Sequence, residues 1–460
     1  MLKNISEIIA NQKLFFNTEK TKSIDYRISL LKTLKQELLH NEKAVFDALY
    51  KDFKKSEFET YLSEYSMVMS QLNLVIKNLK KWAKPERVKS SLLLFPASSF
   101  IYKAPYGSVL IISPWNYPFI LALEPLILAI AAGNTVVLKP SELTPHTSGL
   151  VSKIITKVFP ENLVASIEGG VDVATELLNQ RWDYIFFTGS VSVGKIIARA
   201  AAKHLTPVTL ELGGKSPCII DDSTDLKLAA KRIVWGKFLN AGQTCIAPDY
   251  ILVKQHSKID LVKFLIEEIK QAYTENIKTS EDFPRIINKK NTQRLANMLD
   301  NETILFGGEV DEDTCYISPT LLDEPDLESA SMQEEIFGPI LPILSYETEQ
   351  DIENIISKYE KPLAFYVFSK NKAFSEGLIS KFSFGGGVVN DTLMHFGNDK
   401  LPFGGVGFSG IGSYHGKFGF DTFSHQKSIV KRKTWIDPPV RYAPYSGKLK
   451  LIKAFFKYFT

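Results

Sequence analysis

Hydrophobic residues recur every three or four positions through the first eighty residues, as in Ile28, Leu31, Leu34 and Leu38, with lysines and acids between them. This spacing places the apolar side chains on one face of a helix. From Tyr106 the pattern changes to short apolar runs separated by Gly, Pro and Asn, which is typical of buried strands. We therefore predict a helical N-terminal region followed by a sheet.

The apolar runs alternate with longer segments of helical pattern. Because parallel strands need a long crossover connection, this alternation predicts parallel α/β sheets. A second series begins after Gly214, which predicts a second α/β unit. The strand runs are SVLIIS, NTVVLKP, DYIFFTG, PVTLELGG, PCIID and YILVKQ, and the expected helices cover residues 148–159, 193–204, 226–238 and 259–273.

The composition is that of an ordinary globular protein, with 460 residues, 45% hydrophobic and 23% charged residues. At about 100 to 200 residues per domain, this length predicts two to four structural units. Lys and Arg number 55 and Asp and Glu 51, so the net charge is only +4. No long basic block precedes the extreme C-terminus, and a nucleic-acid partner is therefore not expected.

The sequence favours a cytoplasmic protein. Three cysteines are too few for a disulfide framework in a chain of this length. The N-terminus has neither the apolar core nor the small-residue cleavage site of a secretion signal. The longest apolar stretch, residues 120–132, contains Glu124 and Pro125, and it is shorter than the roughly 20 residues that span a bilayer.

A glycine-rich turn at Gly189–Lys195, GSVSVGK, follows an apolar run and opens a helical segment. Such a turn presents backbone N–H groups to a phosphate. It resembles a P-loop, but Ile196 stands where a Ser or Thr would hold magnesium, so an NTPase is not expected. A dinucleotide site and a plain strand–helix turn both remain open.

Other motifs argue against common alternatives. The sequence GVGFSG at 405–410 matches GxGxxG, yet it lies between glycine-rich stretches rather than between a strand and a helix, which predicts a compact loop. Ile411 breaks a GxSxG hydrolase pattern. Neither CxxC nor HxxxH spacing occurs, so we expect no metal.

Three side chains are candidates for chemistry. Cys245 lies among glycine and small polar residues in NAGQTCIAPDY, whereas Cys218 and Cys315 lie in or before strand-like runs. Glu211 ends an apolar strand in LELGGKSP, where burial would raise its pKa toward that of a general base. Asn116, in the stiff turn PWNYP, can donate an amide hydrogen to an oxyanion. Taken singly, each also fits a structural role.

Together these motifs resemble the aldehyde dehydrogenase superfamily. PWNYP, LKPSE, FTGS, LELGGKSP, GQTC, EEIFGP and LPFGG occur in the family's order and spacing over essentially the whole chain. The segments TPVTLELGGKSPC and PFGGVGFSGIGSYHGKFGFDTFSH are most similar to the class 3 branch of fatty and aromatic aldehyde dehydrogenases.

The resemblance implies an α/β fold with three parts and a tail. A Rossmann-like cofactor-binding domain would cover residues 1–86 and 106–210, and a catalytic α/β domain residues 211–410. A small β oligomerisation arm would cover residues 87–105 and 420–434, and a C-terminal tail residues 435–460. The family arm implies a homodimer.

The resemblance also implies roles for individual residues. Cys245 is similar to the family nucleophile, Glu211 to its general base, and Asn116 with the Cys245 N–H to its oxyanion hole. The implied cofactor-binding residues are Trp115, Lys139, Glu142, Gly189, Ser190, Gly194, Leu212, Glu335 and Phe337. Lys139 and Glu142 match the adenosine ribose site, Gly189 and Ser190 the pyrophosphate turn, and Glu335 and Phe337 the nicotinamide side.

The implied activity is oxidation of medium- or long-chain aliphatic or aromatic aldehydes to carboxylic acids through a thioester. A carboxylate at Glu142 favours a free ribose 2′-hydroxyl, so we expect NAD to be preferred, with some use of NADP. A coenzyme A-acylating dehydrogenase would use Cys245 without needing Glu211. A scaffold that only binds a dinucleotide would need neither.

The tail, KLKLIKAFFKYFT from Lys448, sets lysines among leucine, isoleucine and phenylalanine residues. This pattern resembles a basic segment that lies at a membrane interface, and it is too short to span a bilayer. Packing on a partner subunit is the alternative.

Overall fold

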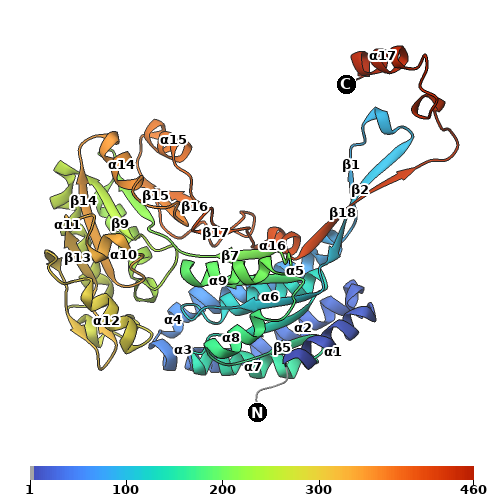
Figure 1. Ribbon diagram of the computed structural model, residues 1–460. Helices are drawn as coiled ribbons and strands as arrows, with labels where there is room; N and C mark the ends of the chain where they lie inside the picture. Colours follow the sequence, from blue (N-terminus) through green and yellow to red (C-terminus); the bar gives the residue numbers. More distant parts are fainter. Residues whose placement is uncertain (1–4, 460) are drawn as a thin grey trace.

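The computed structural model describes residues 5–459 and has two α/β lobes, with a narrow arm projecting from one of them (Figure 1). Residues 1–4 and 460, at the ends of the predicted cofactor domain and tail, lie outside the described part. None of the helices in residues 5–459 is long and apolar enough to cross a membrane.

The N-terminal region is helical, as predicted. Helix α2 begins after Ser23, whose hydroxyl accepts from the Tyr26 N–H, and it buries Leu31, Leu34 and Leu38 on one face. The helices of this region are α1 (Ile5–Asn17), α2 (Ile24–His40), α3 (Glu42–Phe53), α4 (Glu57–Thr60) and α5 (Ser66–Trp82). They pack beside the first sheet and its helices.

The first sheet has six strands in the order β17-β7-β6-β3-β4-β5. All are parallel except β17, which pairs antiparallel to β7. The strands are β3 (Ser108–Ile112), β4 (Thr135–Lys139), β5 (Val164–Ser166), β6 (Tyr184–Thr188), β7 (Val208–Glu211) and β17 (Gly410–Ile411). The associated helices are α6 (Ile120–Ala132), α7 (Pro145–Val158), α8 (Val171–Leu178) and α9 (Val191–Ala202).

The second sheet has seven strands in the order β10-β13-β14-β9-β8-β15-β16, with only β10 antiparallel. Its strands are β8 (Pro217–Ile220), β9 (Tyr250–Lys254), β10 (Ile304–Phe306), β13 (Thr320–Asp323), β14 (Ile340–Tyr346), β15 (Ala364–Phe368) and β16 (Gly386–Val389). The helices are α10 (Leu226–Phe238), α11 (Lys258–Tyr273), α12 (Lys289–Asn297), α13 (Ala330–Gln333), α14 (Glu349–Ile356) and α15 (Lys372–Lys381), and a ribbon joins β11 (Val310–Asp311) to β12 (Tyr316–Ile317).

The two predicted α/β units are confirmed. Helix α10 has the predicted bounds, and Cys218 lies fully buried in β8. Helix α9 begins at Val191 rather than at 193, because the Ser190 side chain caps it by accepting from the Val193 N–H. The predicted domain boundaries stay a prediction; the chain passes from one sheet to the other between β7 and β8.

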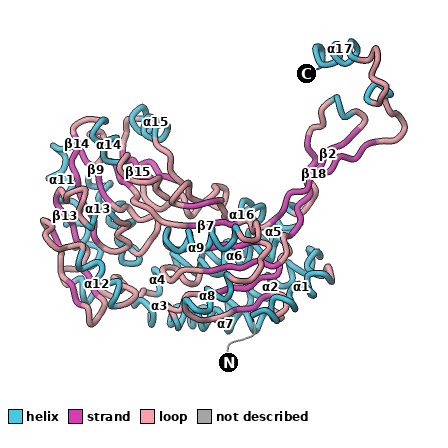
Figure 2. The backbone as a smooth tube through the Cα atoms, viewed as in Figure 1, coloured by secondary structure: helices cyan, strands magenta, loops and turns pink. Residues whose placement is uncertain are grey.

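The arm is an antiparallel sheet of β1 (Glu86–Val88), β2 (Ala97–Pro105) and β18 (Ser424–Arg432). Strands β2 and β18 pair along nine positions, from Ser424 opposite Pro105 to Arg432 opposite Ala97. Helix α16 (Gly416–Thr422) leads into β18, and α17 (Leu449–Phe459) lies beyond the tip of the arm (Figures 1 and 2). The arm therefore stands clear of both lobes.

The GVGFSG segment forms a compact loop, as predicted. A Cβ on Gly405 would lie 2.2 Å from the Ser409 carbonyl oxygen, so the loop folds closely on its own backbone. The loop then enters β17, where Gly410 pairs with Glu211 of β7. This pairing covers the end of β7.

Candidate active site

The candidate side chains gather at the carboxyl ends of the first sheet's strands. β3 leads into the turn that carries Trp115 and Asn116, β6 into Gly189, and β7 ends at Glu211. Parallel strands end at the same edge of a sheet, and ligands of α/β proteins bind there.

Cys245 follows α10 on a loop with an unusual backbone. Asn240, Ala241 and Gly242 all have positive φ, at 53°, 51° and 76°, and their left-handed turn sends the chain back toward the first sheet. The Cys245 side chain is half-buried. Burial raises the pKa of the thiol, the carboxylates of Glu335 and Glu211 raise it further, and the backbone N–H groups of Cys245 and Ile246 lower it. The backbone next to the sulfur therefore offsets part of the effect of burial on the thiol.

Glu211 is a buried carboxyl group, 2% exposed. Neither of its oxygens has a hydrogen-bond partner among the described residues. Burial raises the pKa of Glu211 well above its usual value, and the nearby carboxylate of Glu124 raises it further. A base with a raised pKa holds a proton more strongly than an exposed carboxylate.

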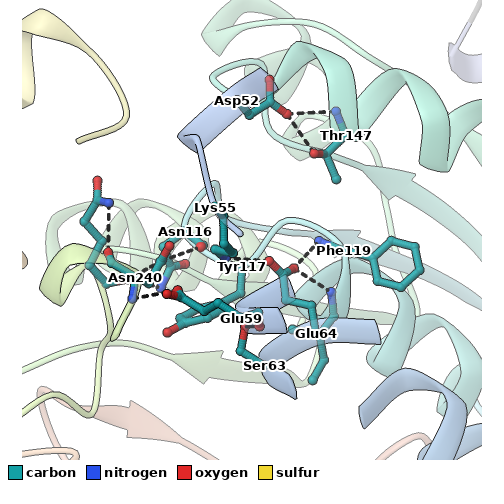
Figure 3. Close-up of polar contacts among 12 residues, drawn as sticks. Asp52, Lys55, Glu59, Ser63, Glu64, Asn116, Tyr117, Phe119, Thr147 and Asn240 are labelled. Atoms are coloured by element: carbon teal, nitrogen blue, oxygen red, sulfur yellow. Dashed lines mark hydrogen bonds and ion pairs between the residues drawn. The ribbon is translucent and has the colours of Figure 1, made fainter. Parts of the chain in front are cut away.

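Asn116 is held against the loop that carries the thiol (Figure 3). Its Nδ2 donates to the Gln243 carbonyl at 3.0 Å. The next residue, Tyr117, shares a 2.6 Å hydrogen bond between its hydroxyl and that of Thr244. The turn after β3 and the residues just before Cys245 are therefore tied together at two points, and Asn116 keeps a second amide hydrogen.

A cavity of about 410 Å³ opens beside Cys245. Its lining is largely apolar and includes Leu121, Trp235, Leu393 and Phe396. Such a cavity suits an apolar molecule whose reactive end meets the thiol.

Two polar residues of this cavity were not identified from the sequence. Glu124 of α6 and His415, just before α16, both line it, with Glu124 Oε2 3.8 Å from His415 Nε2. Burial raises the pKa of Glu124 to about 8, and burial, with a contribution from His395, lowers that of His415 to about 3. The signal available in the sequence was a lone acid within the apolar run 120–132.

The glycine-rich turn lies at the N-terminus of α9, where backbone N–H groups are free of helical partners. The Gly189 N–H donates to the Glu211 carbonyl at 3.0 Å, which joins this turn to β7. A Cβ on Gly194 would lie 2.7 Å from Leu212 Cδ2, so these two residues form a tight contact. Lys195 lies over the Phe408 ring at 4.1 Å. The turn is therefore suited to a pyrophosphate held by backbone rather than by lysine.

Lys139 and Glu142 form an ion pair at the end of β4, with 2.5 Å between Nζ and Oε2. The Glu142 side chain is 41% exposed, whereas that of Lys139 is 5% exposed. The carboxylate therefore faces solvent at the strand end, next to β3 in the sheet.

Glu335 and Phe337 come to the site from the second lobe. Glu335 Oε1 is enclosed without a hydrogen-bond partner among the described residues, and burial raises its pKa to about 8, with a further contribution from Asp249. The Phe337 ring meets Trp115 edge to face, with ring centres 5.2 Å apart. The unsatisfied oxygen fits a polar ligand such as a ribose hydroxyl.

The described residues contain no group of three or more His, Cys, Asp or Glu side chains that could hold a metal ion.

Comparison with known proteins gives a consistent result. Residues 2–429 match the aldehyde dehydrogenase family. The 4,4'-diaponeurosporen-aldehyde dehydrogenase of Staphylococcus aureus is 49% identical over 98% of this chain and 99% of its own length. The aldehyde dehydrogenase family 3 member A2 of Pongo abelii is 45% identical over 96% of this chain and 93% of its own. The expected similarity to the class 3 branch is confirmed.

Solved structures agree with the fold. The substrate-bound state of Staphylococcus aureus AldH superposes with a TM-score of 0.97 at 48% identity, covering 99% of this chain and 100% of that one. A Mycobacterium tuberculosis aldehyde dehydrogenase complexed with NAD+ gives a TM-score of 0.83 at 26% identity over 93% and 90% of the two chains. The chain therefore belongs to the aldehyde dehydrogenase family and oxidises aldehydes to carboxylic acids.

Proposed function

We propose that this enzyme oxidises medium- or long-chain aliphatic or aromatic aldehydes through a thioester on Cys245, with NAD preferred to NADP. The observation that carries the proposal is that the half-buried thiol of Cys245 lines an apolar cavity and has the buried carboxyl of Glu211 near enough to raise its pKa. The relative named for 4,4'-diaponeurosporen-aldehyde supports a long apolar substrate. We expect the enzyme to act in the cytoplasm.

In the first step, Cys245 Sγ bonds to the aldehyde carbon. The thiol proton passes to the nearby Glu211 carboxylate, because the raised pKa of Glu211 makes it a good acceptor. The carbonyl oxygen becomes an oxyanion, held by the free amide hydrogen of Asn116 and the Cys245 N–H. Loss of one such donor costs about 3 to 4 kcal/mol of transition-state stabilisation.

When bound, the dinucleotide would supply the acceptor for the hydride of this adduct. Before the last step Glu211 releases the thiol proton to solvent. Glu211 then takes a proton from water as the water oxygen attacks the thioester carbon. The carbon–sulfur bond breaks, the carboxylic acid leaves, and the sulfur regains a proton from Glu211.

The dinucleotide would lie along the edge of the first sheet. Gly189 and Ser190 would hold its pyrophosphate at the start of α9, and Lys139 and Glu142 its adenosine ribose. Gly194 and Leu212 would give a flat apolar contact, and Trp115, Glu335 and Phe337 would hold the nicotinamide end. The carboxylate of Glu142 would repel a ribose 2′-phosphate, which favours NAD.

The first test is to mix the enzyme with NAD and a medium-chain aldehyde and to follow NADH absorbance. Cys245→Ala should abolish NADH formation, and the matched control Cys315→Ala, a second half-buried cysteine, should leave it unchanged. NADH that forms only with coenzyme A would favour the acylating enzyme. No NADH under either condition would favour a dinucleotide-binding scaffold.

We also propose that the arm joins two copies of the chain. Strand β18 is largely exposed, and within residues 5–459 it pairs along only one edge, with β2, so it offers an open surface to a second subunit. Sedimentation equilibrium should give twice the chain mass of 51.8 kDa, and the mass of one chain would contradict the proposal.

The tail is proposed to make weak contact with a membrane surface. Helix α17 carries Lys450, Lys453 and Lys457 with exposed Leu449 and Leu451, a combination that binds anionic lipid surfaces. Full-length enzyme should pellet with liposomes of anionic lipid, and a variant ending at Gly447 should not. Equal pelleting of the two proteins would refute membrane contact through the tail and favour packing of the tail on the partner subunit.

A further inference from the structure

The left-handed turn before Cys245 is held by a residue from a distant part of the chain. Asn240 and Ala241 adopt φ values of 53° and 51°, which L residues rarely adopt unless surrounding contacts impose them. The Asn240 N–H donates at 2.8 Å to Oε1 of Glu59 (Figure 3). Glu59 lies on α4 and is only 8% exposed.

The Asn240 side chain carries this anchor to the reacting groups. Its Nδ2 donates to the Asn116 carbonyl at 2.8 Å and to the Gln243 carbonyl at 3.3 Å. The same Gln243 carbonyl accepts from Asn116 Nδ2 at 3.0 Å. The Asn240 side chain thus holds the backbone of both Asn116 and Gln243, which lies two residues before Cys245. Glu59 in turn holds the backbone of Asn240.

The segment that carries Glu59 is itself rigidly placed. Helix α4 continues into a π-helical turn, Tyr61–Tyr65, a feature often found at functional sites. Within that turn Glu64 Oε1 lies 2.8 Å from Lys55 Nζ, and both side chains are fully buried. Glu64 Oε2 accepts from the N–H groups of Phe119 and Ile120, at 2.9 and 3.3 Å. The same short segment therefore also holds the start of α6, directly after the Asn116 turn.

We propose that Glu59 is a positioning residue for the reaction, which sets Cys245 and Asn116 relative to each other through Asn240. This inference rests on the proposed role of Cys245 as nucleophile. Glu59 lies outside the cavity lining and contacts neither thiol nor substrate. Its loss should therefore lower kcat and the reactivity of the thiol while leaving dinucleotide affinity unchanged, because the dinucleotide residues lie on other strand ends.

The test compares four variants. Glu59→Leu removes the acceptor, Glu59→Asp draws the carboxylate back by one methylene, and Glu59→Gln keeps an oxygen acceptor at the same length. Glu57→Ala is the matched control, since Glu57 lies on the same helix with its side chain 71% exposed. The measurements are kcat and KM for the aldehyde at saturating NAD, the rate of Cys245 alkylation by iodoacetamide, and the NAD dissociation constant.

We expect Glu59→Leu and Glu59→Asp to lower kcat at least 10-fold and to change the alkylation rate, with NAD affinity within 2-fold of wild type. Glu59→Gln should keep kcat within about 3-fold, and Glu57→Ala should match wild type. If Glu59→Leu does not fold, the same measurements on Glu59→Asp test the proposal. A wild-type kcat in Glu59→Asp would overturn the proposal. So would a fall of kcat in Glu59→Gln as large as that in Glu59→Asp, together with weakened NAD binding. Activity retained in Cys245→Ala would instead refute the proposed function.

Discussion

Replacing Gly242 by alanine adds one methyl group to the turn three residues before Cys245. The added Cβ would lie 2.3 Å from the Gly338 carbonyl oxygen and 2.5 Å from its carbon, both backbone atoms. The residue also has φ of +76°. A left-handed conformation costs a residue with a side chain about 1 to 2 kcal/mol, and overpacking costs about 1 to 3 kcal/mol. The native turn would therefore be destabilised by about 2 to 5 kcal/mol.

The loop can relieve the clash only by moving, and Cys245 moves with it. A displacement of about 1 Å at a reacting group costs on the order of 100-fold in rate. We expect Gly242→Ala to lower kcat/KM for aldehyde oxidation by about two orders of magnitude, with a lower apparent melting temperature. The assay is NADH absorbance at saturating NAD, together with a thermal melt at fixed enzyme concentration.

The same substitution elsewhere provides the control. Gly377 lies within α15, and nothing is within 4 Å of the position of its added Cβ. Gly377→Ala should leave kcat/KM unchanged and stabilise the helix by about 0.5 to 1 kcal/mol. Wild-type kcat/KM and melting temperature in Gly242→Ala would refute the reasoning, because the turn would then tolerate a side chain.

Three further predictions concern charge. Lys55→Met should destabilise the enzyme by about 3 to 5 kcal/mol, because it leaves the buried Glu64 carboxylate without its cation; an unchanged urea midpoint would contradict this. As the proposed base, Glu211 works only when deprotonated, so kcat should fall as pH is lowered through its raised pKa. Glu124→Gln removes a charge that raises the pKa of Glu211, so the fall of kcat should occur at lower pH. An unchanged pH–kcat profile would show that the Glu124 charge does not affect the pKa of Glu211. Glu142→Ala should raise the ratio of kcat/KM for NADP to that for NAD about tenfold, equivalent to about 1.4 kcal/mol; an unchanged ratio would place the ribose elsewhere.

The pattern of apolar residues predicted the strands and helices well, because burial of one face of an element depends on residues close together in the sequence. The apolar runs marked buried parallel strands, and the bounds of α10 followed from its helical periodicity. Glu211 was correctly placed at a strand end for the same reason. The start of α9 was missed by two residues, because one hydroxyl of Ser190 sets it.

Contacts between distant segments could not be read from periodicity. Glu124 and His415 meet in one cavity only after α6 and the segment before α16 have packed together. No motif in the sequence marks Glu59, although it accepts a hydrogen bond from the turn before Cys245. Recognising such residues requires the tertiary structure, since each acts through a partner far along the chain.

The arm has a consequence for the order in which the protein can fold as it is made. Strand β2 pairs along its length with β18, and Glu211 pairs with Gly410. Chains fold from the N-terminus during synthesis, and long closures are slow. The first sheet can therefore assemble from β3 to β7 during translation. Strand β17 and the arm can form only after the final part of the chain has been synthesised. A nascent enzyme would hold Glu211, the proposed general base, uncovered until translation is almost complete. It would therefore gain catalytic competence and the proposed pairing with a second subunit at nearly the same moment.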